Sequence, residues 1–145
     1  MIEEGTFKVL GGNHIIYVFL CKSKSNVGNK LLPQELENKV KGILGWYQAK
    51  MQVPGQQMFR MQTEPGLFGG SPSKEVYDKW LSDFMACLKT LDQRLVENPN
   101  LCGGRITIGD IIVFNELSLF LELNGLTVKS PEFQGMPNLT KWFEK

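Results

Sequence analysis

A signal for starting a buried helix, within residues 101–112 (LCGGRITIGDII), constrains the fold more than any other stretch. Thr107 stands at an N-cap position, where its hydroxyl can accept from the N–H of Asp110 while the Asp110 carboxylate accepts from the N–H of Thr107. Ile106 and Ile111 have the spacing of a hydrophobic staple, the apolar contact that fixes how the chain enters a helix. We therefore predict a helix after Thr107 and a structural role for these four residues.

Apolar residues at helical spacing predict a mainly helical chain. A long helix is expected after Pro33, with an apolar stripe that reaches Met51 and a kink or stop at residues 53–55 (VPG). Residues 71–72 (SP) fit the start of the next helix, which should end before Pro99. Its expected buried stripe is Val76, Trp80, Phe84, Leu88, Leu91 and Leu95.

The Thr107 helix is apolar on nearly all sides, as a central buried helix should be. Gly109 inside it costs up to about 1 kcal/mol relative to Ala, so we expect a close packing neighbour there. The helix should end at Gly125, and residues 130–131 (SP) and 136–142 (MPNLTKW) predict two further helix starts. The only β-structure expected is a short strand over residues 6–10.

Composition excludes several classes of function. The 145 residues carry a net charge of +1, which provides no field to attract nucleic acid or an anionic membrane. His14 is the only histidine, so a histidine-based metal cluster and a Ser/His/Asp triad are excluded by count, and no metal site is expected.

The three cysteines lack the spacing of a redox or zinc pair, which favours a reducing compartment, the cytoplasm or an organelle matrix. The apolar run over residues 14–21 is too short to span a membrane. We therefore expect a soluble intracellular protein with no membrane insertion.

Two motifs resemble a known family. Leu101, Gly103, Arg105, Thr107, Ile108 and Asp110 match the pattern L-x-G-x-R-x-T-I-x-D, and residues 136–142 match P-N-L-x-x-W. Both patterns, and the order of the helices, are similar to the C-terminal all-helical domain of the glutathione transferases, nearest the theta-like classes. The resemblance implies an all-α fold: a helical bundle over residues 32–145, preceded over residues 1–31 by a linker and the last strand and helix of a thioredoxin-like domain.

The resemblance also bears on chemistry. The part of the family's thioredoxin-like half that activates the glutathione thiol has no counterpart in this sequence, so no catalytic residue is assigned and we expect a non-enzyme without a cofactor. Asn13 aligns with the glutathione-binding helix start, although a plain N-cap explains it better. Trp46, Lys50 and Met51 fall where the family lines its co-substrate pocket, although core packing is the commoner role of such residues. Arg105 is expected to bind local carbonyl groups.

The leading hypothesis is a non-catalytic interaction or structural subunit of a larger assembly, with a protein partner or a homodimer. An apolar stripe of Phe59, Met61, Leu67 and Phe68 falls where the family builds part of its dimer contact. The alternative is a truncated or partly recorded glutathione transferase that conjugates glutathione to electrophiles. A third hypothesis is a small-molecule carrier with its ligand beside Trp46.

Overall fold

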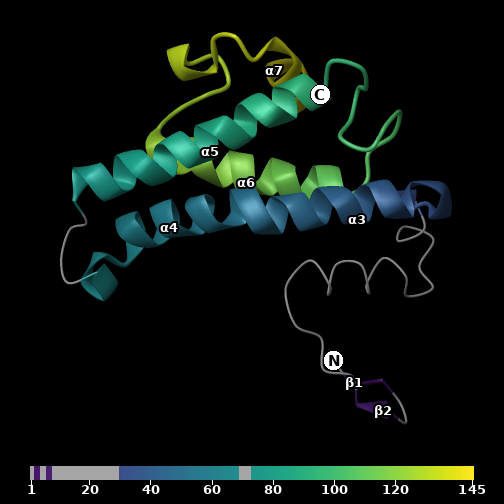
Figure 1. The fold of residues 1–145 in the computed structure, drawn as a ribbon, viewed down its shortest axis with the longest axis horizontal. Coiled ribbons are helices and arrows are strands. Elements are labelled where there is room, and N and C mark those ends of the chain that lie inside the picture. The colour runs from purple at the N-terminus through teal and green to yellow at the C-terminus, as the bar shows by residue number, and fades with distance from the viewer. Residues whose placement is uncertain (1, 4–5, 8–29, 69–72) are drawn as a thin grey trace.

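The computed structural model describes residues 2–3, 6–7, 30–68 and 73–145. The described elements are β1 (Ile2–Glu3), β2 (Thr6–Phe7), η1 (Gln34–Leu36), α3 (Glu37–Trp46), η2 (Tyr47–Met51), α4 (Gln52–Thr63), η3 (Pro65–Phe68), α5 (Lys74–Arg94), α6 (Ile108–Asn124), η4 (Pro131–Phe133) and α7 (Pro137–Phe143). In Figure 1, α5 and the continuous α3–α4 helix run lengthwise, α6 is seen between them in this view, and α7 lies on the side of α5 away from α3. Helix α4 packs directly against α5 and also against α6. The predicted all-α bundle is confirmed.

The N-terminal β-structure is a two-stranded antiparallel pair. Ile2 of β1 is opposite Phe7 of β2, and Glu3 is opposite Thr6. The sequence predicted a strand over residues 6–10 but not its β1 partner. The helix start predicted at Asn13 lies outside the described residues.

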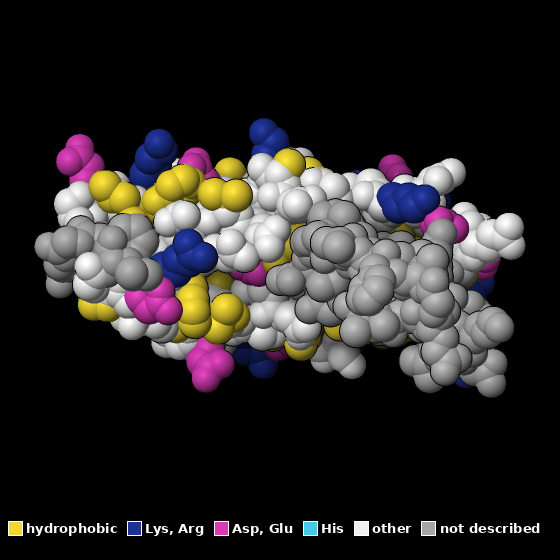
Figure 2. Space-filling view, turned by 90° about the horizontal axis from the view of Figure 1, so that it is seen from below, with side chains coloured by type: hydrophobic (Ala, Val, Ile, Leu, Met, Phe, Trp, Pro, Cys, Tyr) yellow, Lys and Arg dark blue, Asp and Glu magenta, His cyan; other side chains and the backbone are white. Residues whose placement is uncertain are grey.

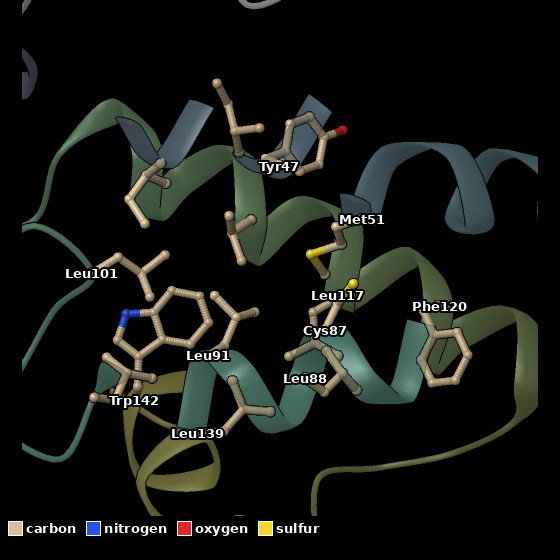
Figure 3. Close-up of a cluster of buried hydrophobic side chains, with 14 of the residues drawn as sticks. Tyr47, Met51, Cys87, Leu88, Leu91, Leu101, Leu117, Phe120, Leu139 and Trp142 are labelled. Atoms are coloured by element: carbon tan, nitrogen blue, oxygen red, sulfur yellow. The ribbon is translucent and has the colours of Figure 1, made fainter. Parts of the chain in front are cut away.

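The core is one apolar cluster built around α6. Its largest fully buried side chains include Ile43 and Leu44 from α3, Phe84 and Leu88 from α5, and Leu117 from α6. Figure 3 shows α3, η2, α5, α6 and α7 contributing side chains to this cluster. The rings of Phe84 and Phe120 stack with their centroids 4.5 Å apart. As predicted, α6 is the central helix.

The close neighbour expected at Gly109 is Ile43. A Cβ atom at Gly109 would lie 3.2 Å from Ile43 Cγ2, which is tighter than ordinary van der Waals contact. The missing side chain thus lets the first turn of α6 approach α3, and this contact offsets the low helix propensity of glycine.

The helix predicted to kink or stop at residues 53–55 continues through them. Pro54 lies inside α4, and the preceding turn, η2, is a π-helix. Pro54 has no N–H to give to the Lys50 carbonyl four residues earlier. The Cys87 thiol of α5 donates to that carbonyl instead, with Sγ 3.5 Å from the oxygen. A π-turn and a donor from another helix thus accommodate the proline.

The helix predicted to start at residues 71–72 starts slightly later. Ser73 is the N-cap of α5, and its Oγ accepts a hydrogen bond from the Val76 N–H at 3.3 Å. Val76 was predicted to be buried but is 44% exposed, because it lies in the first turn. The later members of the predicted stripe, from Phe84 to Leu95, are buried, and Trp80 is half-buried.

The end of α6 follows the prediction. Gly125 has φ +61°, the left-handed conformation that favours glycine after a helix. The Leu126 N–H then donates to the Leu121 carbonyl at 2.9 Å, which closes the helix end. The two later helix starts are also present, as the single turn η4 and as α7 with Pro137 in its first turn.

Candidate functional site

A single carboxylate, Asp110, organises the start of α6. Its Oδ2 accepts from the N–H of Thr107 at 2.9 Å and from the Thr107 hydroxyl at 2.8 Å. Its Oδ1 accepts from the Leu101 N–H at 2.8 Å and from Trp142 Nε1 at 3.3 Å. The side chains form the reciprocal capping box. Four donors therefore compensate a carboxylate that is only 3% exposed, which supports a structural function for it.

A second carboxylate, Asp92 of α5, caps a different helix. Its Oδ1 accepts from the N–H groups of Asn138 and Leu139 at 2.8 and 2.9 Å, and its Oδ2 accepts from Asn138 Nδ2 at 3.3 Å. These N–H groups lie in the first turn of α7, which has no side-chain cap of its own. Sequence reasoning missed Asp92, because no local pattern connects residues 46 positions apart.

The third notable carboxyl group, Glu116, lies between α6 and the α3–α4 helix. Tyr47, the first residue of the π-turn, donates its hydroxyl proton to Glu116 Oε2 at 2.7 Å. A Cβ atom at Gly55 would lie only 2.0 Å from Glu116 Oε1, so glycine makes the space for this carboxyl group. Burial raises the pKa of Glu116, and the Tyr47 hydrogen bond lowers it by a smaller amount. The arrangement holds a carboxyl group that keeps its proton to higher pH than usual.

The three residues predicted for a co-substrate pocket differ in how far they are buried. Met51 is fully buried in the core, so it does not line a surface pocket. Trp46 is half-buried against the same core, whereas Lys50 is exposed. Asn13, the predicted remnant of the glutathione site, lies outside the described residues. The structure therefore places Met51 in the core, Trp46 at its edge and Lys50 at the surface, and the role predicted for Asn13 stays a prediction.

Arg105 does not bind local carbonyl groups as predicted. Its Nη2 atom forms an ion pair with Glu35 Oε1 at 2.5 Å, and both side chains are 59% exposed. Glu35 lies in η1, so the pair links the loop before α6 to the segment before α3. Sequence spacing gave no signal for a contact across 70 positions.

The buried thiols of Cys87 and Cys102 are free cysteines. Burial is the main cause that raises the pKa of each thiol. A protonated Cys87 is the state that donates to the Lys50 carbonyl. Among the residues that the structure describes, no group of three or more His, Cys, Asp or Glu side chains is placed to hold a metal ion. No helix within the described ranges is long and apolar enough to cross a membrane.

Three exposed apolar residues lie on α6 or just before it. Of the six large hydrophobic side chains exposed in the described part of the chain, three lie between residues 106 and 119: Ile106 (58% exposed), Phe114 (39%) and Leu119 (37%). In contrast, Met61 of the predicted dimer stripe is buried and Phe59 is half-buried. The side chains of Leu67 and Phe68 lie outside the described part. On the face in Figure 2, side chains of both charge signs are interspersed among apolar ones.

Comparison with known proteins identifies the fold. Residues 74–145 match the family model of the glutathione S-transferase C-terminal domain. The structure is similar to the crystal structure of a glutathione S-transferase from Pseudomonas fluorescens Pf-5, with a TM-score of 0.70 and 19% sequence identity. That similarity covers 93% of this chain and 62% of the other, so this chain spans less than two thirds of that protein. A search of curated protein sequences found no match. Residues 74–145 thus match the glutathione S-transferase C-terminal domain, and the chain has a fold similar to that of a glutathione S-transferase.

Proposed function

We propose that this chain is a non-catalytic interaction or structural subunit of a larger assembly inside the cell. The observation that carries the proposal is the pair of large apolar side chains that α6 exposes. Helices that are apolar on nearly all sides are normally buried all round. Eight residues of α6 are buried, yet Phe114 and Leu119 of the same helix reach solvent. A protein partner that covered these two side chains would remove their apolar surface from water.

The polar groups near this surface support a binding role over a catalytic one. Asp110 is engaged by four donors, and Glu116 is held by Tyr47 against Gly55. Both oxygens of Asp110 accept hydrogen bonds inside the fold, and burial raises the pKa of Glu116. The buried thiols of Cys87 and Cys102 are consistent with the reducing compartment proposed here.

The experiment measures assembly by size-exclusion chromatography with light scattering. The variant Leu119→Asp places a charge on the exposed side of α6, and Val96→Asp places one on a residue that is 66% exposed in the loop after α5. We expect the wild-type chain to self-associate or to require a partner for solubility, and Leu119→Asp alone to abolish that behaviour. A monodisperse wild-type monomer that Leu119→Asp leaves unchanged would contradict the proposal.

The second candidate function is that of a glutathione transferase, of which this chain would be one part and which conjugates glutathione to electrophiles. The observation that favours it is the length of the similar Pseudomonas enzyme, of which this chain spans 62%. Calorimetry with glutathione separates the two candidates. No heat at millimolar glutathione supports the non-catalytic subunit, whereas saturable binding to a stable dimer would place the enzyme first.

A further inference from the structure

We propose that a cavity between the start of α6 and the end of α7 is a binding site for a small uncharged aromatic molecule. The cavity has a volume of about 190 Å³. It is lined by Asn100, Ile106, Asp110, Ile111, Phe114, Trp142, Phe143 and Lys145. It does not include Trp46, Lys50 or Met51, so it is separate from the co-substrate position predicted from the sequence.

Three aromatic rings form one wall of the cavity. The rings of Phe114 and Phe143 are stacked, with centroids 4.6 Å apart and an interplanar angle of 19°. Trp142 presents its ring to Phe114 at 70°, with centroids 6.2 Å apart. Aromatic rings attract one another in these stacked and edge-on geometries. A further ring entering the cavity would extend an aromatic cluster that is already formed.

The two staple residues, Ile106 and Ile111, also line the cavity, and Ile106 is 58% exposed. The staple predicted from the sequence therefore leaves apolar surface uncovered at the entrance to α6. A bound apolar molecule would cover Ile106 and supply the burial that the staple lacks.

The polar groups at the cavity favour an uncharged ligand. Both oxygens of Asp110 are occupied, and one of their donors is the Trp142 indole N–H, which points toward Leu101 in Figure 3. Lys145 Nζ donates to the Pro99 carbonyl at 2.5 Å. In the part of the chain that the structure describes, no buried side-chain nitrogen or oxygen lacks a hydrogen-bond partner. A charged ligand inside the cavity would lose its hydration. An anion could pair only with the further N–H groups of the exposed Lys145 among the charged lining residues, and the Asp110 carboxylate would oppose its charge.

The volume sets the size of the ligand. An engineered cavity of about 150 Å³ lined by Leu, Ile and Phe is known to bind benzene, and drug-sized ligands occupy about 300–1,000 Å³. The present cavity therefore accommodates a single ring with a short substituent. A ligand of that size makes few contacts, and we expect a Kd on the order of 1 mM or below.

The test uses toluene as the uncharged probe and benzoate as a charged molecule of similar shape. Toluene should bind saturably, and its protons should give nuclear Overhauser effects to the methyl groups of Ile106 and Ile111. At ten times Kd it should raise the Tm by about 3–6 °C. Benzoate should bind at least tenfold more weakly. Absence of saturable toluene binding, or benzoate binding as tightly as toluene, would overturn the proposal.

Matched variants locate the site. Phe114→Asp places a charge on the cavity wall, and Leu119→Asp places one on the same helix outside the cavity at nearly the same exposure, 37% against 39%. We expect Phe114→Asp to weaken toluene binding at least tenfold and Leu119→Asp to change it less than twofold. If Phe114→Asp does not fold, Ile106→Asp replaces it, because Ile106 precedes the helix and is mostly exposed. Equal loss in the cavity and control variants would place the binding elsewhere.

Discussion

The starts of α6 and α7 solve one problem in two ways. Every helix start leaves backbone N–H groups without partners inside the helix. At α6 the cap comes from the helix itself, through Thr107 and Asp110. At α7 it comes from Asp92, a residue of α5. The first device is local and can be read from the sequence, whereas the second exists only after α5 and α7 have docked.

The difference has an energetic meaning. Asp110 also binds the Leu101 N–H and the Trp142 indole, so the local cap at α6 is tied to the loop before it and to α7. Asp92 connects only two helices. Losing Asp110 should therefore weaken the whole domain, whereas losing Asp92 should mainly loosen α7.

The largest effect is expected for Asp110→Ala. Removal of this carboxylate leaves buried donors of Leu101, Thr107 and Trp142 without a partner, and such groups cost about 1–3 kcal/mol each. With partial relaxation, we expect a loss of about 3–5 kcal/mol in the free energy of unfolding, measured by urea denaturation. Asp78→Ala, an exposed position on α5, is the control. A loss below about 1 kcal/mol would show that Asp110 is no more than an ordinary cap.

A smaller effect is expected for Asp92→Ala. The variant uncaps α7, which should cost about 1–2 kcal/mol. Amide hydrogen exchange distinguishes this local effect from global destabilisation: exchange of Asn138 and Leu139 should accelerate, while exchange within α6 should follow the change in global stability only. Equal acceleration of amide exchange in α6 and α7 would contradict the prediction that Asp92 stabilises α7 locally.

The third prediction concerns Glu116, which is hydrogen-bonded to Tyr47 and does not cap a helix. Because the pKa of Glu116 is raised in the folded state, that state binds the proton more tightly than the unfolded chain does. The wild-type free energy of unfolding should therefore fall as pH rises from the ordinary value of 4.5 through the folded pKa.

Gln stays uncharged and can still accept from Tyr47, so Glu116→Gln should remove this part of the pH dependence and raise the Tm at pH 7. The effect should be smaller than that of Asp92→Ala. Thermal unfolding between pH 4 and 8 provides the measurement, with Glu122→Gln, an exposed residue of α6, as the control. An unchanged slope in Glu116→Gln would contradict the assignment.

The smallest effect is expected for Arg105→Ala. The Arg105–Glu35 pair is short, but both side chains are 59% exposed, and exposed pairs contribute about 0–1 kcal/mol. The free energy of unfolding should change by no more than about 0.5 kcal/mol, and the effect should vanish in high salt. A larger change would mean that the pair helps to hold the loop before α6 in place.

Local signals account for what could be predicted. The capping box of Thr107 and Asp110 depends on two residues of the same helix start, and the end of α6 depends on Gly125. The close approach at Gly109 depends on the lack of a side chain there. The apolar stripe ending at Met51 also follows from helical periodicity. These features gave the all-α fold and most of its core.

Contacts between distant elements account for what could not be predicted. Asp92 reaches α7, Tyr47 reaches Glu116, and Arg105 reaches Glu35 across 46, 69 and 70 positions. The Lys50 carbonyl, four residues before Pro54, accepts from the Cys87 thiol, which only the packing of α5 brings near. The cavity beside Phe114 likewise exists only where α6 meets α7.

The π-turn at η2 also changes the side of the helix on which the apolar residues of α3 and α4 lie. A π-turn rotates the chain by fewer degrees per residue than an α-turn does. Residues at unbroken helical spacing therefore point to different sides before and after it. Before the turn, α3 packs against α6, and after it α4 packs against both α5 and α6. One continuous helix thereby packs against different neighbours before and after the π-turn, and Pro54 lies within this helix without ending it.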